Sequence, residues 1–131
     1  MIKIKRRKEN VDMKKIYHLT SCSTNVRILK ELNLEGVELQ NIKEENIDEK
    51  TLDFLKEKVG SYEALFSKKA MKYRSMGLNE MVLTEQDYKK YILEEYTFIK
   101  RPFMINEDQV FIGNAKSVVA EAVASFGASN A

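Results

Sequence analysis

The only cysteine and the only histidine of this 131-residue chain lie four residues apart, at Cys22 and His18. The residues around the cysteine are small and polar: Thr20, Ser21, Ser23, Thr24 and Asn25. A helix that starts just after Cys22, with Ser23 and Thr24 as caps, would place the sulfur close to exposed backbone N–H groups. The positive end of the helix dipole favours a thiolate at such a position. The segment therefore predicts a reactive cysteine.

Each candidate residue of this segment also has a purely structural interpretation. A lone cysteine is often a small buried apolar side chain, although the polar neighbours of Cys22 favour reactivity. His18 either packs in a sheet with a hydrogen-bonded ring or helps to hold the thiolate through its charged form. Arg27 either binds an anionic substrate or lies in solvent. One cysteine and one histidine do not supply the three or four ligands that zinc needs, so no metal site is predicted.

The elements around the cysteine predict a βαβ unit. Residues 16–19 are typical of a short buried strand, and apolar residues then recur at helical spacing up to about Asn33. Residues 37–42 alternate between apolar and polar side chains, as in a half-buried strand. A strand, a helix and a strand within roughly 30 residues favour a parallel pair with a right-handed crossover.

The middle of the chain is predicted to be helical. Its end is predicted to form a hairpin followed by a helix. One helix is predicted within residues 46–60, and another begins at Thr84, where Asp87 completes a capping-box pattern. Residues 103–105 and 109–112 are two strands around a three-residue turn at 106–108. Residues 117–126 form an alanine- and valine-rich helix. The whole is an α/β layout with a helical insertion.

Composition limits the classes of function. Lysine and arginine number 22 and aspartate and glutamate 20, so the net charge of +2 argues against a general nucleic-acid-binding surface. Nothing indicates a membrane span, a signal peptide or an oxidising compartment, so a cytoplasmic protein is expected. We expect residues 1–13 to be a basic flexible lead or a tag for an anionic partner, residues 14–126 a single domain, and 127–131 a tail.

Four short motifs occur in an order that is known from one family. They are Tyr17-His18 with Cys22, YRSMGL at residues 73–78, IKRP at residues 99–102, and IGN at residues 112–114. With these motifs, roughly residues 14–124 resemble the family of glutaredoxin-type arsenate reductases and Spx proteins. The resemblance implies a thioredoxin-like mixed sheet, in the order βαβ then ββα, with a helical insertion.

The resemblance also implies roles for matching residues. Cys22 falls at the nucleophile that attacks the arsenic oxyanion, and His18 at a histidine kept near the thiolate. Arg101 falls at one of three arginines that bind the oxyanion, and Pro102 at the proline beside it. In such a fold a cis bond before Pro102 would lie against the cysteine loop and Arg101 would point at the same cleft. The alternative for Arg101 is a solvated pair with Lys100 at a strand start.

The chain departs from the family pattern at three positions. Ser67 stands where the first anion-binding arginine is expected, with Lys68 beside it, and Asn114 stands at the last, in a Gly-Asn pair that resembles Spx. Arg27, Lys68 and Asn114 are therefore further candidates for anion binding. Asn25 occupies the second cysteine position of the Spx redox switch, so an oxidised Cys22 must pair with an outside thiol.

We therefore predict an arsenate reductase-like thiol oxidoreductase with a single nucleophilic cysteine, whose true substrate is a small oxyanion or a thiol and need not be arsenate. No bound cofactor is expected, glutathione is the expected co-substrate, and glutaredoxin is the expected partner of a monomer. The alternative is an Spx-like transcriptional regulator that binds the RNA polymerase alpha subunit without a redox switch. Neither a membrane nor direct nucleic-acid binding is expected.

Overall fold

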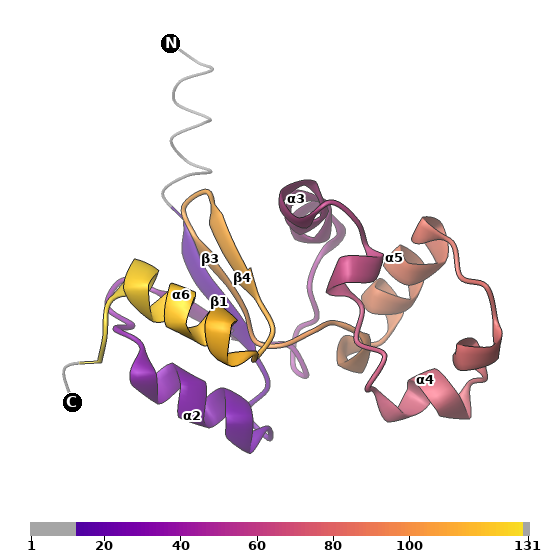
Figure 1. The fold of residues 1–131 in the computed structure, drawn as a ribbon, viewed down its shortest axis with the longest axis horizontal. Helices are drawn as coiled ribbons and strands as arrows, with labels where there is room; N and C mark the ends of the chain where they lie inside the picture. Colours follow the sequence, from indigo (N-terminus) through magenta and orange to yellow (C-terminus); the bar gives the residue numbers. More distant parts are fainter. Residues whose placement is uncertain (1–12, 130–131) are drawn as a thin grey trace, which may run out of the picture. The chain divides into compact units, whose positions relative to one another are not determined.

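A computed structural model describes residues 13–129, so the predicted basic lead, Met1–Asp12, lies outside the described residues together with Asn130 and Ala131. The chain divides into two compact units: Met1–Asn41 with Arg101–Ala131, and Ile42–Lys100 (Figure 1). The boundaries predicted at residues 13 and 126 stay predictions. Within residues 13–129, no helix has the length and apolar character that crossing a membrane requires.

The first unit is built on a four-stranded mixed sheet with the strand order β2-β1-β3-β4. β1 (Lys14–His18) pairs in parallel with β2 (Glu38–Asn41), and α2 (Ser23–Glu31) connects the two. β3 (Phe103–Asn106) runs antiparallel to β1, and β4 (Gln109–Ile112) antiparallel to β3. The predicted βαβ unit and hairpin are therefore confirmed, and they share one sheet.

One face of this sheet carries α2 and α6 (Lys116–Phe126), which lie along it side by side (Figure 1). Ile16 of β1 and Met104 of β3 are register partners, and both are fully buried beneath Ile28 of α2 and Ala122 of α6. Because side chains alternate along a strand, His18 shares the face of Ile16. Tyr17 points to the opposite face, where its ring stacks on Phe103 at a centroid distance of 4.3 Å.

The second unit is helical, as the predicted insertion requires. Its elements are α3 (Glu49–Val59), η1 (Glu63–Leu65), α4 (Met71–Ser75), η2 (Leu78–Glu80), α5 (Glu85–Glu94) and η3 (Tyr96–Phe98). Asp48 caps α3 by accepting from Thr51 N–H at 2.8 Å, and Gly60 ends it with φ +103°. The capping box of Thr84 and Asp87 is present at the start of α5. The core of this unit contains the stacked rings of Phe66 and Phe98, which are both buried.

Two local predictions are wrong. Ser23 and Thr24 do not cap α2, because the N-cap residue is Cys22 itself and makes no side-chain capping bond. The hairpin turn has two residues instead of three, because Asn106 pairs with Gln109 as the last rung of the ladder. The side-chain amide of Asn106 donates to Ser125 Oγ at 2.8 Å, and this contact with α6 helps to hold it in the strand. Glu107 takes the left-handed position of the turn with φ +60°.

Candidate functional site

The cysteine lies where the chain turns from β1 into α2. Cys22 N–H donates to the carbonyl of Leu19 at 3.0 Å, and the carbonyl of Cys22 accepts from Val26 N–H at 3.1 Å as the first bond of the helix. Cys22 is in extended conformation, as N-cap residues are, with φ −97° and ψ 114°. Its side chain is half-buried and its thiol is free. The sulfur is thus held at the N-terminal end of a nine-residue helix while it stays accessible to a reactant.

Asn25 is the residue that fixes this turn, and sequence reasoning did not assign it a role in the site. Its side chain is fully buried. Its Oδ1 accepts from Leu19 N–H at 2.9 Å, and its Nδ2 donates to Sγ of Cys22 at 3.4 Å. An asparagine three residues after the cysteine was the available signal, because positions i and i+3 of a helix face the same side.

His18 ends β1 and is almost completely buried, with 8% of its surface exposed. Burial lowers the pKa of its imidazole below the ordinary 6.5, because the charged form loses hydration. The neutral ring is therefore the favoured form at neutral pH. This burial agrees with a ring packed against the sheet, and a role of His18 at the thiol stays a prediction.

Arg101 and Pro102 lie at the same end of the sheet as the cysteine turn. β3 begins at Phe103 opposite Tyr17, so Arg101-Pro102 enters the sheet where β1 ends. Their peptide bond is cis, as the thioredoxin-type hypothesis expected, and Pro102 is buried. The carbonyl of Pro102 accepts from Gly113 N–H at 2.8 Å, which brings the end of β4 to the same place. Asn114 follows Gly113 and is exposed.

The sequence also predicts anion binding by Arg27 and Lys68, and for both residues this stays a prediction. Arg27 is exposed on α2, and five residues of helix rotate it by about 140° from the direction of Cys22. Lys68 belongs to the second unit, where its Nζ pairs with Glu63 at 2.9 Å and lies 6.0 Å from the ring centroid of Tyr88. The structure thus gathers the cysteine, the histidine, the cis proline, Arg101 and Asn114 at one end of the sheet of the first unit.

Within the part of the chain that the structure describes, no group of three or more histidine, cysteine, aspartate or glutamate side chains is arranged to hold a metal ion. The side chains at this end of the sheet supply a thiol, an imidazole, a guanidinium and two amides, one of them buried.

The mixed sheet, the cysteine at a strand-to-helix turn and the cis proline just before the neighbouring strand β3 define a thioredoxin-like protein. The sequence model of the ArsC family matches residues 17–122, so the chain belongs to the ArsC family. The match begins in β1 and ends in α6, and so it covers both units. None of the curated proteins matches the chain.

Solved structures of arsenate reductases and related proteins have the same fold. Arsenate reductase from Vibrio cholerae superposes with a TM-score of 0.70 at 22% identity, covering 86% of this chain and 99% of that one. An ArsC family related protein from Bacteroides fragilis gives 0.71 at 19% identity with the same coverage, 86% and 99%. An arsenate reductase related protein from Brucella melitensis gives 0.59 at 21% identity, covering 88% and 95%. At these low sequence identities, the comparisons show that the fold is shared.

Proposed function

We propose that this protein is an arsenate reductase-like thiol oxidoreductase in which Cys22 is the nucleophile and an external thiol resolves the intermediate. The observation that carries the proposal is the placement of Cys22 at the N-cap of α2, half-exposed and with an amide donor on its sulfur. The Asn25 amide donates to the sulfur at 3.4 Å and so helps to orient the Cys22 side chain at the start of the helix.

The chain contains one cysteine, so the second thiol comes from outside. With arsenate, Cys22 sulfur bonds to arsenic and a hydroxyl leaves as water. Glutathione then attacks the Cys22 sulfur, a sulfur–sulfur bond forms, and arsenic departs with the electron pair as arsenite. A second thiol, from glutathione or glutaredoxin, attacks the mixed disulfide and releases Cys22. Two thiols are oxidised to one disulfide, which balances the two-electron reduction of arsenic.

Arg101 is the residue we assign to binding the anion, because it precedes the buried cis proline at the end of the sheet that holds the cysteine turn. Asn114 offers an uncharged amide from the end of β4, where a guanidinium would form a charge-assisted pair. We therefore expect weak selection for a fully charged oxyanion, and a glutathione-linked or otherwise oxidised thiol is the alternative substrate.

The test combines two measurements on the full chain. The first is arsenite production from arsenate in the presence of glutathione and glutaredoxin, compared with Cys22→Ser. The second is the rate at which iodoacetamide alkylates Cys22, compared with a free cysteine peptide at the same pH. Faster alkylation than the peptide supports the nucleophile even where arsenate is a poor substrate. No arsenite above the Cys22→Ser background, together with alkylation no faster than the peptide, overturns the proposal.

A second candidate is an Spx-like regulator that binds the RNA polymerase alpha subunit. The observation that favours it is the exposed Asn114 in the Gly113-Asn114 pair, in place of an arginine. In this case binding does not require the thiol, so Cys22→Ser retains it. Retention of the alpha subunit on the immobilised full chain supports this candidate, and no retention at micromolar concentrations rules it out.

A further inference from the structure

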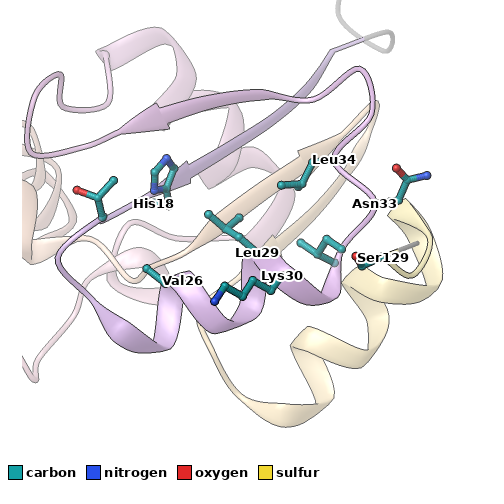
Figure 2. A pocket seen from close by; sticks show the side chains of 9 residues that line it. His18, Val26, Leu29, Lys30, Asn33, Leu34 and Ser129 are labelled. Carbon is teal, nitrogen blue, oxygen red and sulfur yellow. The ribbon is translucent and has the colours of Figure 1, made fainter. Parts of the chain in front are cut away.

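A pocket of about 810 Å³ lies along α2 in the first unit, and the function proposed above makes no use of it. Figure 2 shows the side chains that line it. Four of the nine lining residues are aliphatic: Val26, Leu29, Leu32 and Leu34. The volume falls within the range of about 300–1,000 Å³ that small-molecule sites occupy. Cys22 is absent from the lining, so the pocket is distinct from the thiol.

The pocket is elongated. His18 lies at one end and Leu34, Asn33 and Ser129 lie at the other, with Leu29 between them (Figure 2). Val26 and Leu32 are six residues apart on one helix, which corresponds to about 9 Å along its axis. A ligand that follows this wall is therefore longer than it is wide.

The apolar wall of the pocket is anchored to the core on one side and exposed to solvent on the other. Leu29 and Leu34 are partly buried and pack against the core cluster of Ile16, Ile28 and Met104. Val26 has 39% of its surface exposed, and among the described residues of the first unit Leu39 is the other large apolar side chain that is so accessible. A ligand with an alkyl body would remove this surface from water at about 25 cal/mol for each Å².

The pocket lining carries a positive charge and no negative charge. Lys30 is the one lysine or arginine among the lining residues, and none of them is an aspartate or glutamate. The side chain of Lys30 runs back along α2 toward the end that carries Val26 (Figure 2), as expected for residues four apart on a helix. Within residues 13–129, no carboxylate forms an ion pair with Lys30.

We propose that this pocket binds a small amphipathic anion, with an unbranched alkyl chain along Val26, Leu29 and Leu34 and its carboxylate at the Lys30 ammonium. This site goes beyond the oxidoreductase proposal and does not depend on it, because neither the thiol nor Arg101 contacts the ligand. The alkyl chain supplies affinity, and the single cation selects a carboxylate over an uncharged head group.

Octanoate is the probe, used below its micelle concentration, and 1-octanol is the uncharged control of equal chain length. The experiment is a titration of the ¹⁵N-labelled full chain followed by amide chemical shifts. We expect octanoate to shift the signals of residues 26–34 and Ser129, and 1-octanol to bind about two- to fivefold more weakly, as the loss of one exposed ion pair predicts. Equal binding of the two, shifts confined to the second unit, or no shifts at millimolar octanoate would overturn the proposal.

Three variants sharpen the test. Lys30→Gln removes the cation and should weaken octanoate by about two- to fivefold while leaving 1-octanol unchanged. Val26→Glu places a carboxylate on the apolar wall and should weaken octanoate further than Lys30→Gln. Lys116→Gln, at an exposed lysine that begins α6 in the same unit, should change neither. Circular dichroism verifies that each variant is folded. Equal effects of Lys30→Gln and Lys116→Gln would contradict the assignment of the anion to Lys30.

Discussion

The side-chain amide of Asn25 donates to the sulfur of Cys22 at 3.4 Å while its oxygen accepts from the backbone N–H of Leu19 at 2.9 Å. Both ends of the amide are therefore engaged, one by the residue that leaves the strand and one by the residue that begins the helix. Because Asn25 is fully buried, these contacts are shielded from competing water. The strand, the turn and the thiol are coupled through a single side chain.

Replacing Asn25 tests that coupling. Asn25→Ala removes the donor to Cys22 and leaves the buried Leu19 N–H without its acceptor, which should cost about 1–3 kcal/mol in the free energy of unfolding. Alkylation of Cys22 at pH 7 should slow in the same variant. Asn25→Asp keeps an acceptor for Leu19 but sets a carboxylate against the sulfur, so alkylation should slow there too. Denaturant unfolding and iodoacetamide kinetics measure the two effects, and unchanged alkylation in both variants would contradict a role of the amide at the thiol.

His18 gives a direct titration, because it is the only histidine. Burial lowers its pKa, so the Hε1 proton signal should titrate with a midpoint below 6.5 in the folded protein and near 6.5 in denaturant. The folded state then binds fewer protons than the unfolded state between these two values. Stability should therefore be fully present above pH 6.5 and fall as the pH drops through the lowered folded pKa. A midpoint at or above 6.5 would show that the ring gains a charge-stabilising partner.

The variant His18→Asn isolates this contribution. The loss of unfolding free energy between pH 7 and pH 5 should be smaller in His18→Asn than in the parent protein, because the buried imidazole whose protonation is penalised has been removed. Urea unfolding at both pH values measures the difference. Identical pH dependence in the two proteins would assign the acid sensitivity to the carboxylates instead.

Helix capping differs between α5 and α2, and the difference is measurable. Thr84 Oγ1 accepts from Asp87 N–H at 3.2 Å and the Asp87 carboxylate accepts from Thr84 N–H at 2.8 Å. Thr84→Ala should lower the free energy of unfolding by about 1 kcal/mol. Ser23→Ala is the matched control, since Ser23 is exposed and lies inside the first turn of α2. Thermal unfolding compares them, and equal losses would mean that Ser23 caps α2 after all.

The same cap carries a pH dependence. The hydrogen bond from the backbone of Thr84 holds the pKa of Asp87 below its ordinary 3.8. The contribution of the ionised carboxylate is therefore present above pH 3.8 and is lost as the pH falls through the lowered folded pKa. Asp87→Asn should remove this part of the acid sensitivity, which unfolding curves at pH 3 and pH 5 would show as a smaller difference than in the parent protein.

The core beneath α2 should be sensitive to the loss of volume. Ile28 is 1% exposed and joins the helix to Ile16 and Met104 of the sheet. Ile28→Ala should cost about 2–5 kcal/mol, because it removes buried methyl groups and leaves a cavity. Val82→Ala, at a residue that is 96% exposed, should stay within about 0.5 kcal/mol. Denaturant midpoints measure both, and a small loss for Ile28→Ala would show that the core repacks around the missing volume.

Much of the fold could be predicted because its signals are local. The alternation and spacing around the cysteine predicted β1, α2 and β2, and two short strand patterns around a turn predicted the hairpin. The capping-box pattern at Thr84 predicted the start of α5. Each of these features depends on residues within a few positions of one another, so the sequence displays them directly.

The remaining features depend on contacts between distant residues. Asn106 completes β3 with help from Ser125, which lies 19 positions later, so a turn pattern alone could not show the shorter hairpin loop. His18 is 8% exposed only once the chain has folded around the end of β1, so its burial and the lowered pKa that follows could not be read from the sequence. In the sequence, Asn25 is one of five polar residues around the cysteine. Only in the folded turn does its amide contact both Leu19 N–H and the sulfur of Cys22.

The single cysteine limits what oxidation can make of this protein. A chain with one thiol can form only one disulfide bond. A disulfide between two copies therefore leaves no free thiol to which a third copy could be linked. Oxidative cross-linking therefore stops at a pair, and a mixed disulfide with a small thiol blocks even that. Intact mass under oxidising conditions should accordingly show the monomer, one adduct per chain, or a dimer, with no ladder of higher species.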